Sequence, residues 1–146
     1  MHSAYLRNGE MASRRLYVTK EFGQWYKNEL PKFDQGFTEP QPPTQQVDTR
    51  LKQYVHGKYL FPAKQIKFLS HTSGIIWELK TRHVRIFGAF AKRDCFLLHC
   101  GGDATWLKEN HQYVAEADKA TAAFETIANG NFKFIESGKI DDVISN

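Results

Sequence analysis

The alternation of apolar and polar positions is clearest between residues 75 and 100, where the chain reads IIWELKTRHVRIFGAFAKRDCFLLHC. A two-residue period of this kind is typical of strands with one buried face. Turn-forming residues precede this stretch and interrupt it near His83 and at residues 93–94. We therefore predict an antiparallel meander of three strands, at residues 75–82, 85–91 and 95–100.

Two amphipathic helices are predicted before these strands. Their apolar residues recur at helical spacing over residues 21–30 and 44–57, and a proline and a glycine mark their ends. The loop-forming residues between them make the pair a helical hairpin. We expect this hairpin to cover one face of the sheet, because the stripe of Ile75, Trp77 and Leu79 needs an apolar partner.

The rest of the pattern completes an α+β fold: two N-terminal helices packed on an antiparallel sheet, with a C-terminal helix. Residues 16–19 and 63–69 are predicted as short strands, and Gly101–Gly102 is expected to break the sheet. Helical spacing then runs over residues 106–128. We place an extension outside the fold at residues 1–13, a single domain at 14–130, and a tail at 131–146 whose packing the pattern leaves open.

Composition adds a charge pattern to this picture. Apolar residues make up 41% of the 146 residues and aromatic residues 14%, which suffices for one packed domain. The net charge is +4, yet residues 64–93 hold seven Lys or Arg and one carboxylate, Glu78. Glu78, Lys80 and Arg82 share the second face of the predicted sheet, which is left for water or a ligand. A local basic field favours polyanions such as nucleic acid, and a merely solvated basic face is the alternative.

The sequence does not contain the motifs of several common catalytic and metal sites. The chain has no phosphate-binding glycine loop, no HExxH motif and no nucleophile elbow. Cys95 and Cys100 lie five apart in one predicted strand, so we expect two buried free thiols rather than a disulfide or metal site. We expect no metal and no cofactor. No apolar run spans a bilayer and the N-terminus lacks a signal-peptide core, so we expect a cytoplasmic protein with no membrane partner.

The Arg, Lys, His and Tyr side chains near the predicted sheet suit phosphodiester chemistry on RNA. Attack by a ribose 2′-hydroxyl requires a base, cations that stabilise the phosphorane, and an acid for the leaving oxygen. An Arg fork matches phosphate oxygens, and His is the side chain most suited to proton transfer. Because a 2′-hydroxyl is required, such a site cleaves RNA only.

Residues 44–127 resemble the RelE/HigB superfamily of bacterial type II toxins, especially its phage-derived branch. The resemblance is carried by RLKQYVHG at the end of a helix, by FPAKQIKFLSHTSGIIWELKTR, by the hairpin into RIFGAF, and by the FLLH strand before the last helix. It implies two N-terminal helices on a curved antiparallel sheet, so that residues 14–130 form a RelE-like toxin domain. It also implies a ribosome-associated mRNA endoribonuclease, acting by metal-independent 2′-hydroxyl attack and neutralised by a cognate, often helix-turn-helix, antitoxin.

Carried over residue by residue, Arg85 is similar to the family's phosphate-stabilising Arg, Lys80 to its strand cation, and His99 to the His that ends its last strand. Gly101, Gly102 and Asp103 replace basic residues that the family usually has after that His. Candidates to restore the missing function follow in the next helix. The candidate catalytic residues are therefore Arg85, His99, His111 and Tyr113, and the candidate RNA-binding residues are Lys80, Arg82, Lys92, Arg93 and Lys108.

Two other hypotheses stay open. The chain can be a noncatalytic interaction protein on the same fold, which binds an antitoxin or a protein target such as DNA gyrase. It can also be a folded phage remnant without activity. The enzyme hypothesis requires at least one His or Tyr within reach of the Arg85 guanidinium, and Glu78 is expected to pair with a cation. The sequence leaves the oligomeric state open.

Overall fold

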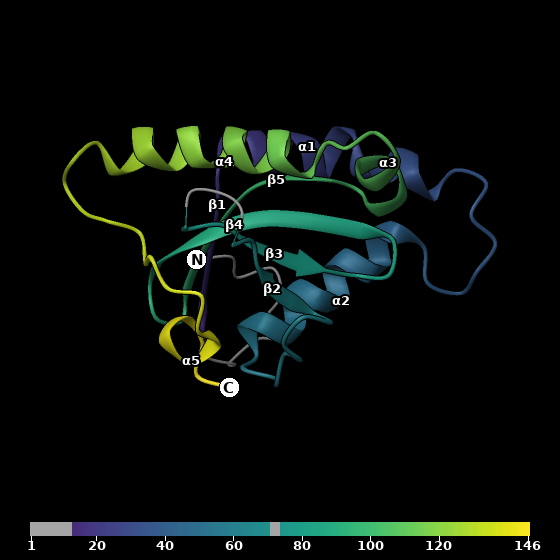
Figure 1. Ribbon diagram of the computed structural model, residues 1–146. Coiled ribbons are helices and arrows are strands. Elements are labelled where there is room, and N and C mark those ends of the chain that lie inside the picture. Colours follow the sequence, from purple (N-terminus) through teal and green to yellow (C-terminus); the bar gives the residue numbers. More distant parts are fainter. Residues whose placement is uncertain (1–12, 71–73) are drawn as a thin grey trace.

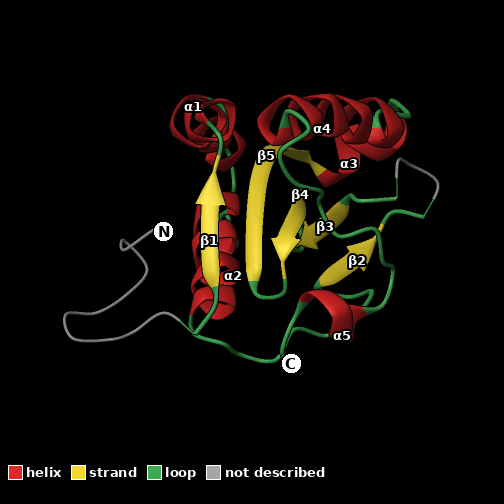
Figure 2. Cartoon of the chain, turned by 90° about the vertical axis from the view of Figure 1, so that its left-hand side faces the viewer, coloured by secondary structure: helices red, strands yellow, loops and turns green. Residues whose placement is uncertain are grey.

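The computed structural model describes residues 13–70 and 74–146. Within these residues the fold is α+β, with a five-stranded mixed sheet, five α-helices and a short 3-10 helix. The strands follow the order β1-β5-β4-β3-β2 (Figure 2). None of the helices in this part of the chain has the length and apolar character to cross a membrane. The elements are β1 (Arg15–Val18), α1 (Lys20–Asn28), η2 (Leu30–Asp34), α2 (Pro43–Val55), β2 (Ile66–Phe68), β3 (Trp77–Lys80), β4 (Val84–Lys92), β5 (Cys95–Asp103), α3 (Ala104–Glu109), α4 (Tyr113–Ala128) and α5 (Ile140–Val143).

The meander of β3, β4 and β5 is confirmed. β3 and β4 pair antiparallel from Trp77 opposite Gly88 to Lys80 opposite Arg85. At the far edge, β1 pairs in parallel with β5, so a wholly antiparallel sheet is wrong. A short β-prone segment predicts a strand, but its local pattern does not specify a partner or a direction.

The helical hairpin covers one face of the sheet, as predicted. Val47 and Leu51 of α2 pack with Leu79 and Ile86 of the sheet in one buried cluster. Phe22 of α1 joins the same cluster. Because these side chains leave water almost completely, their burial is the main stabilising term for this layer.

The second face of the sheet is also covered, so the expectation of an open basic face is wrong over most of its length. Ala117 and Phe124 of α4 pack with Ile76, Phe87 and Ala89 of the sheet. Figure 1 shows α4 and α2 on opposite sides of the sheet. Phe87 and Ala89 share the Arg85 face, and those apolar residues require a helix over them.

Gly101 and Gly102 lie inside β5 and do not break the sheet, contrary to expectation. A Cβ on Gly101 would lie 2.6 Å from the Trp25 ring, and a Cβ on Gly102 would lie 3.1 Å from Leu107. Asp103 then caps α3, since its Oδ1 accepts a hydrogen bond from the Trp106 amide at 2.8 Å. The Gly-Gly-Asp segment thus seats two helices closely against β5.

The single helix predicted over residues 106–128 is two helices. α3 ends at Glu109, His111 has a φ of 53°, and α4 begins at Tyr113. A non-glycine residue with this φ stops a helix, because the left-handed backbone cannot continue the hydrogen-bond ladder. The break allows Tyr113 to pack edge-on against Phe87, with ring centroids 6.1 Å apart.

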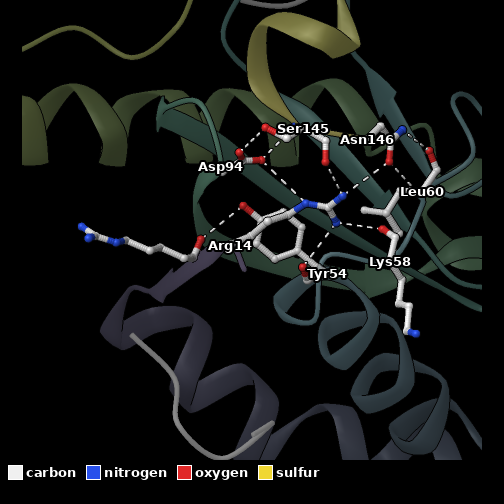
Figure 3. A network of polar contacts seen from close by, with 8 residues as sticks. Arg14, Tyr54, Lys58, Leu60, Asp94, Ser145 and Asn146 are labelled. Carbon is white, nitrogen blue, oxygen red and sulfur yellow. Dashed lines mark hydrogen bonds and ion pairs between the residues drawn. The ribbon is translucent and has the colours of Figure 1, made fainter. Parts of the chain in front are cut away.

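Arg14 joins the end of the chain to the body of the fold (Figure 3). Only 2% of this residue is exposed. Its guanidinium donates hydrogen bonds to the main-chain oxygens of Tyr54, Lys58 and Ser145 at 3.3, 2.9 and 2.9 Å. Its Nε lies 3.7 Å from Oδ1 of Asp94, and its charge lies over the Tyr54 ring. The tail is therefore tied to β1, to α2 and to the β4–β5 turn.

The tail also contributes to the core, a question that the sequence pattern left open. Val143 and Ile144 are completely buried in the cluster beneath α2. The Asp94 amide donates to the Val143 oxygen at 2.8 Å. At the N-terminal end of the described chain, the Ser13 amide donates a hydrogen bond to the Val55 oxygen. Residues 1–12 of the predicted N-terminal extension lie outside the described residues. The same is true of residue 73, in the turn predicted before the strand at residues 75–82.

We predict that Gly101→Ala destabilises the fold by about 1–3 kcal/mol, because its Cβ overlaps the Trp25 ring. Gly23→Ala is the control: Gly23 lies in α1, and a Cβ added there would have nothing within 4 Å, so this change should stabilise by about 0.5–1 kcal/mol. Urea unfolding measures both. Equal effects of the two substitutions would contradict close packing at Gly101.

We predict that Arg14→Met costs about 3–5 kcal/mol, because it leaves three carbonyl groups and Asp94 without their cation. Arg93→Met, at an exposed position, should change stability by less than about 0.5 kcal/mol. Thermal unfolding of both variants tests this. A stability loss for Arg14→Met no larger than for Arg93→Met would show that the network contributes little.

Candidate functional site

A cleft of about 780 Å³ opens where the β3–β4 turn, the end of β5 and the α3–α4 segment meet. We call it the Arg85 cleft. The structure brings five of the nine predicted site residues to it: Arg82, Arg85, Lys108, His111 and Tyr113. The segments that carry them, the β3–β4 turn and the α3–α4 segment, lie at the same end of the sheet (Figure 1). Three cations and two proton-transfer candidates thus line one concave surface.

The cleft is held by contacts between its two walls. Arg85 of β4 pairs with Gly102 of β5, so the strand wall continues directly into the Asp103 cap of α3. The Ala104 amide donates to the His83 oxygen at 2.8 Å, which ties the start of α3 to the β3–β4 turn. Both walls are therefore fixed to the sheet rather than carried on free loops.

Arg85 is oriented by a buried carboxylate. Its Nε lies 3.2 Å from Glu78 Oε1, and the two side chains are only 17% and 5% exposed. Its Nη1 donates to the main-chain oxygens of Val84, at 3.0 Å, and Thr81. The expected pairing of Glu78 with a cation is confirmed. A guanidinium held in this way keeps one orientation, which favours a fixed contact to an anion in the cleft.

Tyr113 supplies a protonated hydroxyl next to Arg85. Burial raises the pKa of Tyr113, and the Glu78 carboxylate raises it further. The charge of Arg85 and its hydrogen bond with Tyr113 act in the opposite direction. Because the net shift is upward, this phenol stays protonated at neutral pH and can act as a hydrogen-bond donor or acid. His111, which is exposed, supplies the imidazole of the same cleft.

His99 lies elsewhere. Its Nδ1 lies 3.0 Å from Thr19 Oγ1, and its ring packs edge-on against Phe124 at 5.9 Å. Burial lowers its pKa, which disfavours the charged form. These contacts join β5 to the N-terminus of α1, which Thr19 caps, and to α4, and His99 does not line the Arg85 cleft.

Three of the predicted RNA-binding cations also lie outside the cleft. Lys80 is opposite Arg85 in the β-ladder, but its Nζ donates to the Ala63 oxygen at 3.0 Å, toward the β2 edge. Lys92 and Arg93 are exposed at the β4–β5 turn. Lys92 lies seven positions after Arg85 along extended β4, which is roughly 23 Å. The basic residues therefore form separate groups rather than one patch.

A second polar cavity, of about 570 Å³, was missed by the sequence analysis. It lies on the α2 side of the β3–β4 turn, and Arg82 lines both this cavity and the Arg85 cleft. The signal was present: Gln46, Thr49, Arg50 and Gln53 recur at helical spacing along α2, on one polar face. A polar stripe on a helix is usually solvated, so the pattern alone does not indicate a cavity.

No three His, Cys, Asp or Glu side chains are grouped to hold a metal ion within residues 13–70 and 74–146. Cys95 and Cys100 are both free thiols, and the Cys100 thiol donates to the Glu116 oxygen at 3.7 Å. The groups that line the Arg85 cleft are two guanidinium groups, one ammonium group, an imidazole and a phenol, together with the Glu109 carboxylate and the Thr105 hydroxyl.

We predict opposite shifts of the Tyr113 pKa in two variants. Arg85→Gln should raise it, since both effects of Arg85 lower it, and Glu78→Gln should lower it, since this carboxylate raises it. The ring-carbon chemical shift of Tyr113, followed by NMR across alkaline pH, measures both. Exposed Tyr59, recorded in the same spectra, reports any global change. Shifts of the same sign in both variants would contradict the Arg85–Glu78–Tyr113 arrangement.

The chain was also compared with known proteins. No protein-family model, no curated protein and no solved structure matches it. The functional argument therefore rests on the residues of the Arg85 cleft.

Proposed function

We propose that this protein is a toxin-like endoribonuclease, which cleaves RNA by attack of a ribose 2′-hydroxyl, with the Arg85 cleft as its active site. One observation carries the proposal: Arg85 and Tyr113 line one cleft, close enough for the Arg85 charge to act on the Tyr113 phenol, and Arg82, Lys108 and His111 line the same cleft. This meets the requirement of a proton-transfer residue within reach of the Arg85 guanidinium. Cations and an acid–base pair in one concave surface are what phosphodiester transfer requires.

Each residue has a role in this reaction. His111 takes the proton of the 2′-hydroxyl, whose oxygen attacks the neighbouring phosphorus. Arg85 stabilises the extra negative charge of the phosphorane through hydrogen bonds to its equatorial oxygens. Tyr113 donates its proton to the leaving 5′-oxygen, which matches its raised pKa. Arg82 and Lys108, both exposed, hold flanking phosphates.

The biological setting follows from the resemblance rather than from the cleft. A RelE-like arrangement implies mRNA on the ribosome as substrate, a cognate helix-turn-helix antitoxin as partner, and action in the cytoplasm. The helical hairpin followed by the β3–β4–β5 meander agrees with that element order. His99 has the family's position in the strand, but His111 and Tyr113 have the better geometry here.

We expect induced expression in a bacterial host to arrest growth and to produce cleaved reporter mRNA, mapped by primer extension. His111→Asn and Tyr113→Phe should each lower cleavage by about 10²-fold or more, since each removes a proton-transfer group. Both changes preserve the fold: Asn accepts the left-handed backbone of His111, and Phe keeps the packing on Phe87.

His99→Asn is the matched control for His111→Asn, and Tyr59→Phe is the matched control for Tyr113→Phe. Both controls change the same residue types outside the cleft, so cleavage should persist in both. Cleavage lost in His99→Asn but kept in His111→Asn would move the active site to the Thr19 side of β5. Folded wild-type protein without arrest and without cleavage would refute the proposal.

A noncatalytic role is the second candidate, and one observation favours it. Trp106, beside the Arg85 cleft, is 52% exposed, and exposed aromatic residues are frequent anchors in protein interfaces. In that case the partner is an antitoxin or a protein target such as DNA gyrase. Growth arrest with intact mRNA, relieved by Trp106→Ala and not by Tyr113→Phe, would support this function.

A further inference from the structure

Arg50 is a half-buried cation without a carboxylate partner in the described part of the chain. It lies on α2 and lines the second polar cavity. Its Nε donates to the Lys80 oxygen at 2.8 Å, and its Nη1 donates to Gln53 Oε1 at 2.7 Å. Both acceptors are neutral. Burial lowers the pKa of Arg50, and among residues 13–70 and 74–146 no carboxylate raises it again. A partly desolvated charge that is not compensated is stabilised by binding an anion.

The other polar groups of the cavity are arranged as donors. Gln53 accepts from Arg50 through its Oε1, and Gln65 accepts from the Phe61 amide through its Oε1 at 2.9 Å. Each carboxamide therefore keeps its NH₂ group to donate. The one carboxylate that lines the cavity, Glu39, lies 3.4 Å from Arg82, and both of these side chains are exposed. The interior presents one cation and amide donors, a combination that suits phosphate oxygens.

The wall of the cavity is rigid. Gln46 is buried, and its Nε2 donates to the Gln41 oxygen at 2.9 Å and contacts His83 Nδ1 at 2.8 Å. Its Oε1 accepts from the Thr81 hydroxyl at 3.1 Å and from the His83 amide at 3.0 Å. One fully bonded side chain thus fixes the loop before α2 and the β3–β4 turn to the helix. Binding to a site whose walls are already fixed costs little conformational entropy.

Arg82 connects this cavity to the Arg85 cleft, since it lines both. We propose that the cavity around Arg50 binds a phosphate of the same RNA strand whose scissile phosphate occupies the Arg85 cleft. Arg82 bridges the two sites after it exchanges Glu39 for phosphate. That exchange is inexpensive, because both partners are solvent-exposed. This inference rests on the proposed function, and it adds the course of the RNA strand from the Arg85 cleft to the Arg50 cavity.

The test measures the affinity for a fluorescent 2′-O-methyl RNA hexamer, by fluorescence anisotropy over a range of salt concentrations. The hexamer cannot be cleaved, because methylation removes the attacking 2′-hydroxyl. Thr49 is exposed at the cavity, so Thr49→Glu places an anion there without changing a buried contact. We expect Thr49→Glu to weaken binding about tenfold. Arg50→Gln should also weaken it and reduce the salt slope by about one.

Thr126→Glu is the matched control, because it makes the same change at an exposed position of α4, remote from both sites. It should bind as wild type, apart from a small effect of net charge. If Arg50→Gln does not fold, Thr49→Glu against Thr126→Glu decides alone. Equal affinity for these two variants would refute the phosphate site.

Two further arms identify the source of the phosphate and separate this inference from the proposed function. Competition by adenosine 5′-monophosphate as strong as by the hexamer would indicate a site for a free nucleotide and would refute the strand path. Competition by a polyglutamate peptide at the same level would indicate an acidic protein partner instead. Weaker hexamer binding by Lys108→Gln, which removes a phosphate contact of the Arg85 cleft, but not by Thr49→Glu would remove the Arg50 site and keep the proposed function.

Discussion

The buried guanidinium of Arg14 is the interaction on which the assembly of the fold depends. A charge with 2% exposure requires acceptors and a counter-charge: three main-chain oxygens accept hydrogen bonds from the Nη atoms, and Nε, which makes no hydrogen bond, has the Asp94 carboxylate at 3.7 Å. These acceptors come from the end of α2, from the β4–β5 turn and from the chain end. Elements far apart in sequence must therefore be in place together before the charge is satisfied. The network thus couples β1, the parallel edge strand, to the antiparallel meander.

The same dependence on close packing shapes the Arg85 cleft. Absence of a Cβ at Gly101 and Gly102 brings Trp25 and Leu107 against β5, one on each face. α3 can then start directly at the end of the strand. The break at His111 turns the chain back, so that Tyr113 meets Phe87 and Arg85. The cleft exists because a strand continues through two glycines where local propensity favours a turn.

Whether a feature of this structure can be predicted from the sequence depends on how far apart along the chain the residues that determine it lie. Most helices and strands are predicted to within a few residues, because 3.6- and two-residue periods are local, but the break between α3 and α4 and the short helix α5 are not predicted. The parallel pairing of β1 with β5 joins residues eighty apart, such as Arg15 and Cys95, and no local pattern encodes it.

Five of the predicted site residues converge in one cleft: Arg82, Arg85, Lys108, His111 and Tyr113. They belong to two segments, one at the start of β4 and one after the end of β5, and these two strand ends are paired in the sheet. His99 does not join them, since its ring turns toward Thr19 and Phe124. The Arg50 cavity was missed because its walls come from three separate segments.

The distribution of ion pairs explains why so many cations in one stretch do not form one basic surface. Arg85 is paired with buried Glu78, and separating that pair would leave a carboxylate uncompensated in the interior. It is therefore a fixed group, which can extend a hydrogen bond to an anion but cannot move to it. Arg82 is paired with exposed Glu39, and water and salt weaken that pair, so Arg82 can change partners at little cost. Under the proposed function, one rigid and one exchangeable guanidinium, with Arg50 beyond them, would act on an RNA strand in sequence: the exposed charge of Arg82 would attract it first, and the fixed Arg85 would position its scissile phosphate.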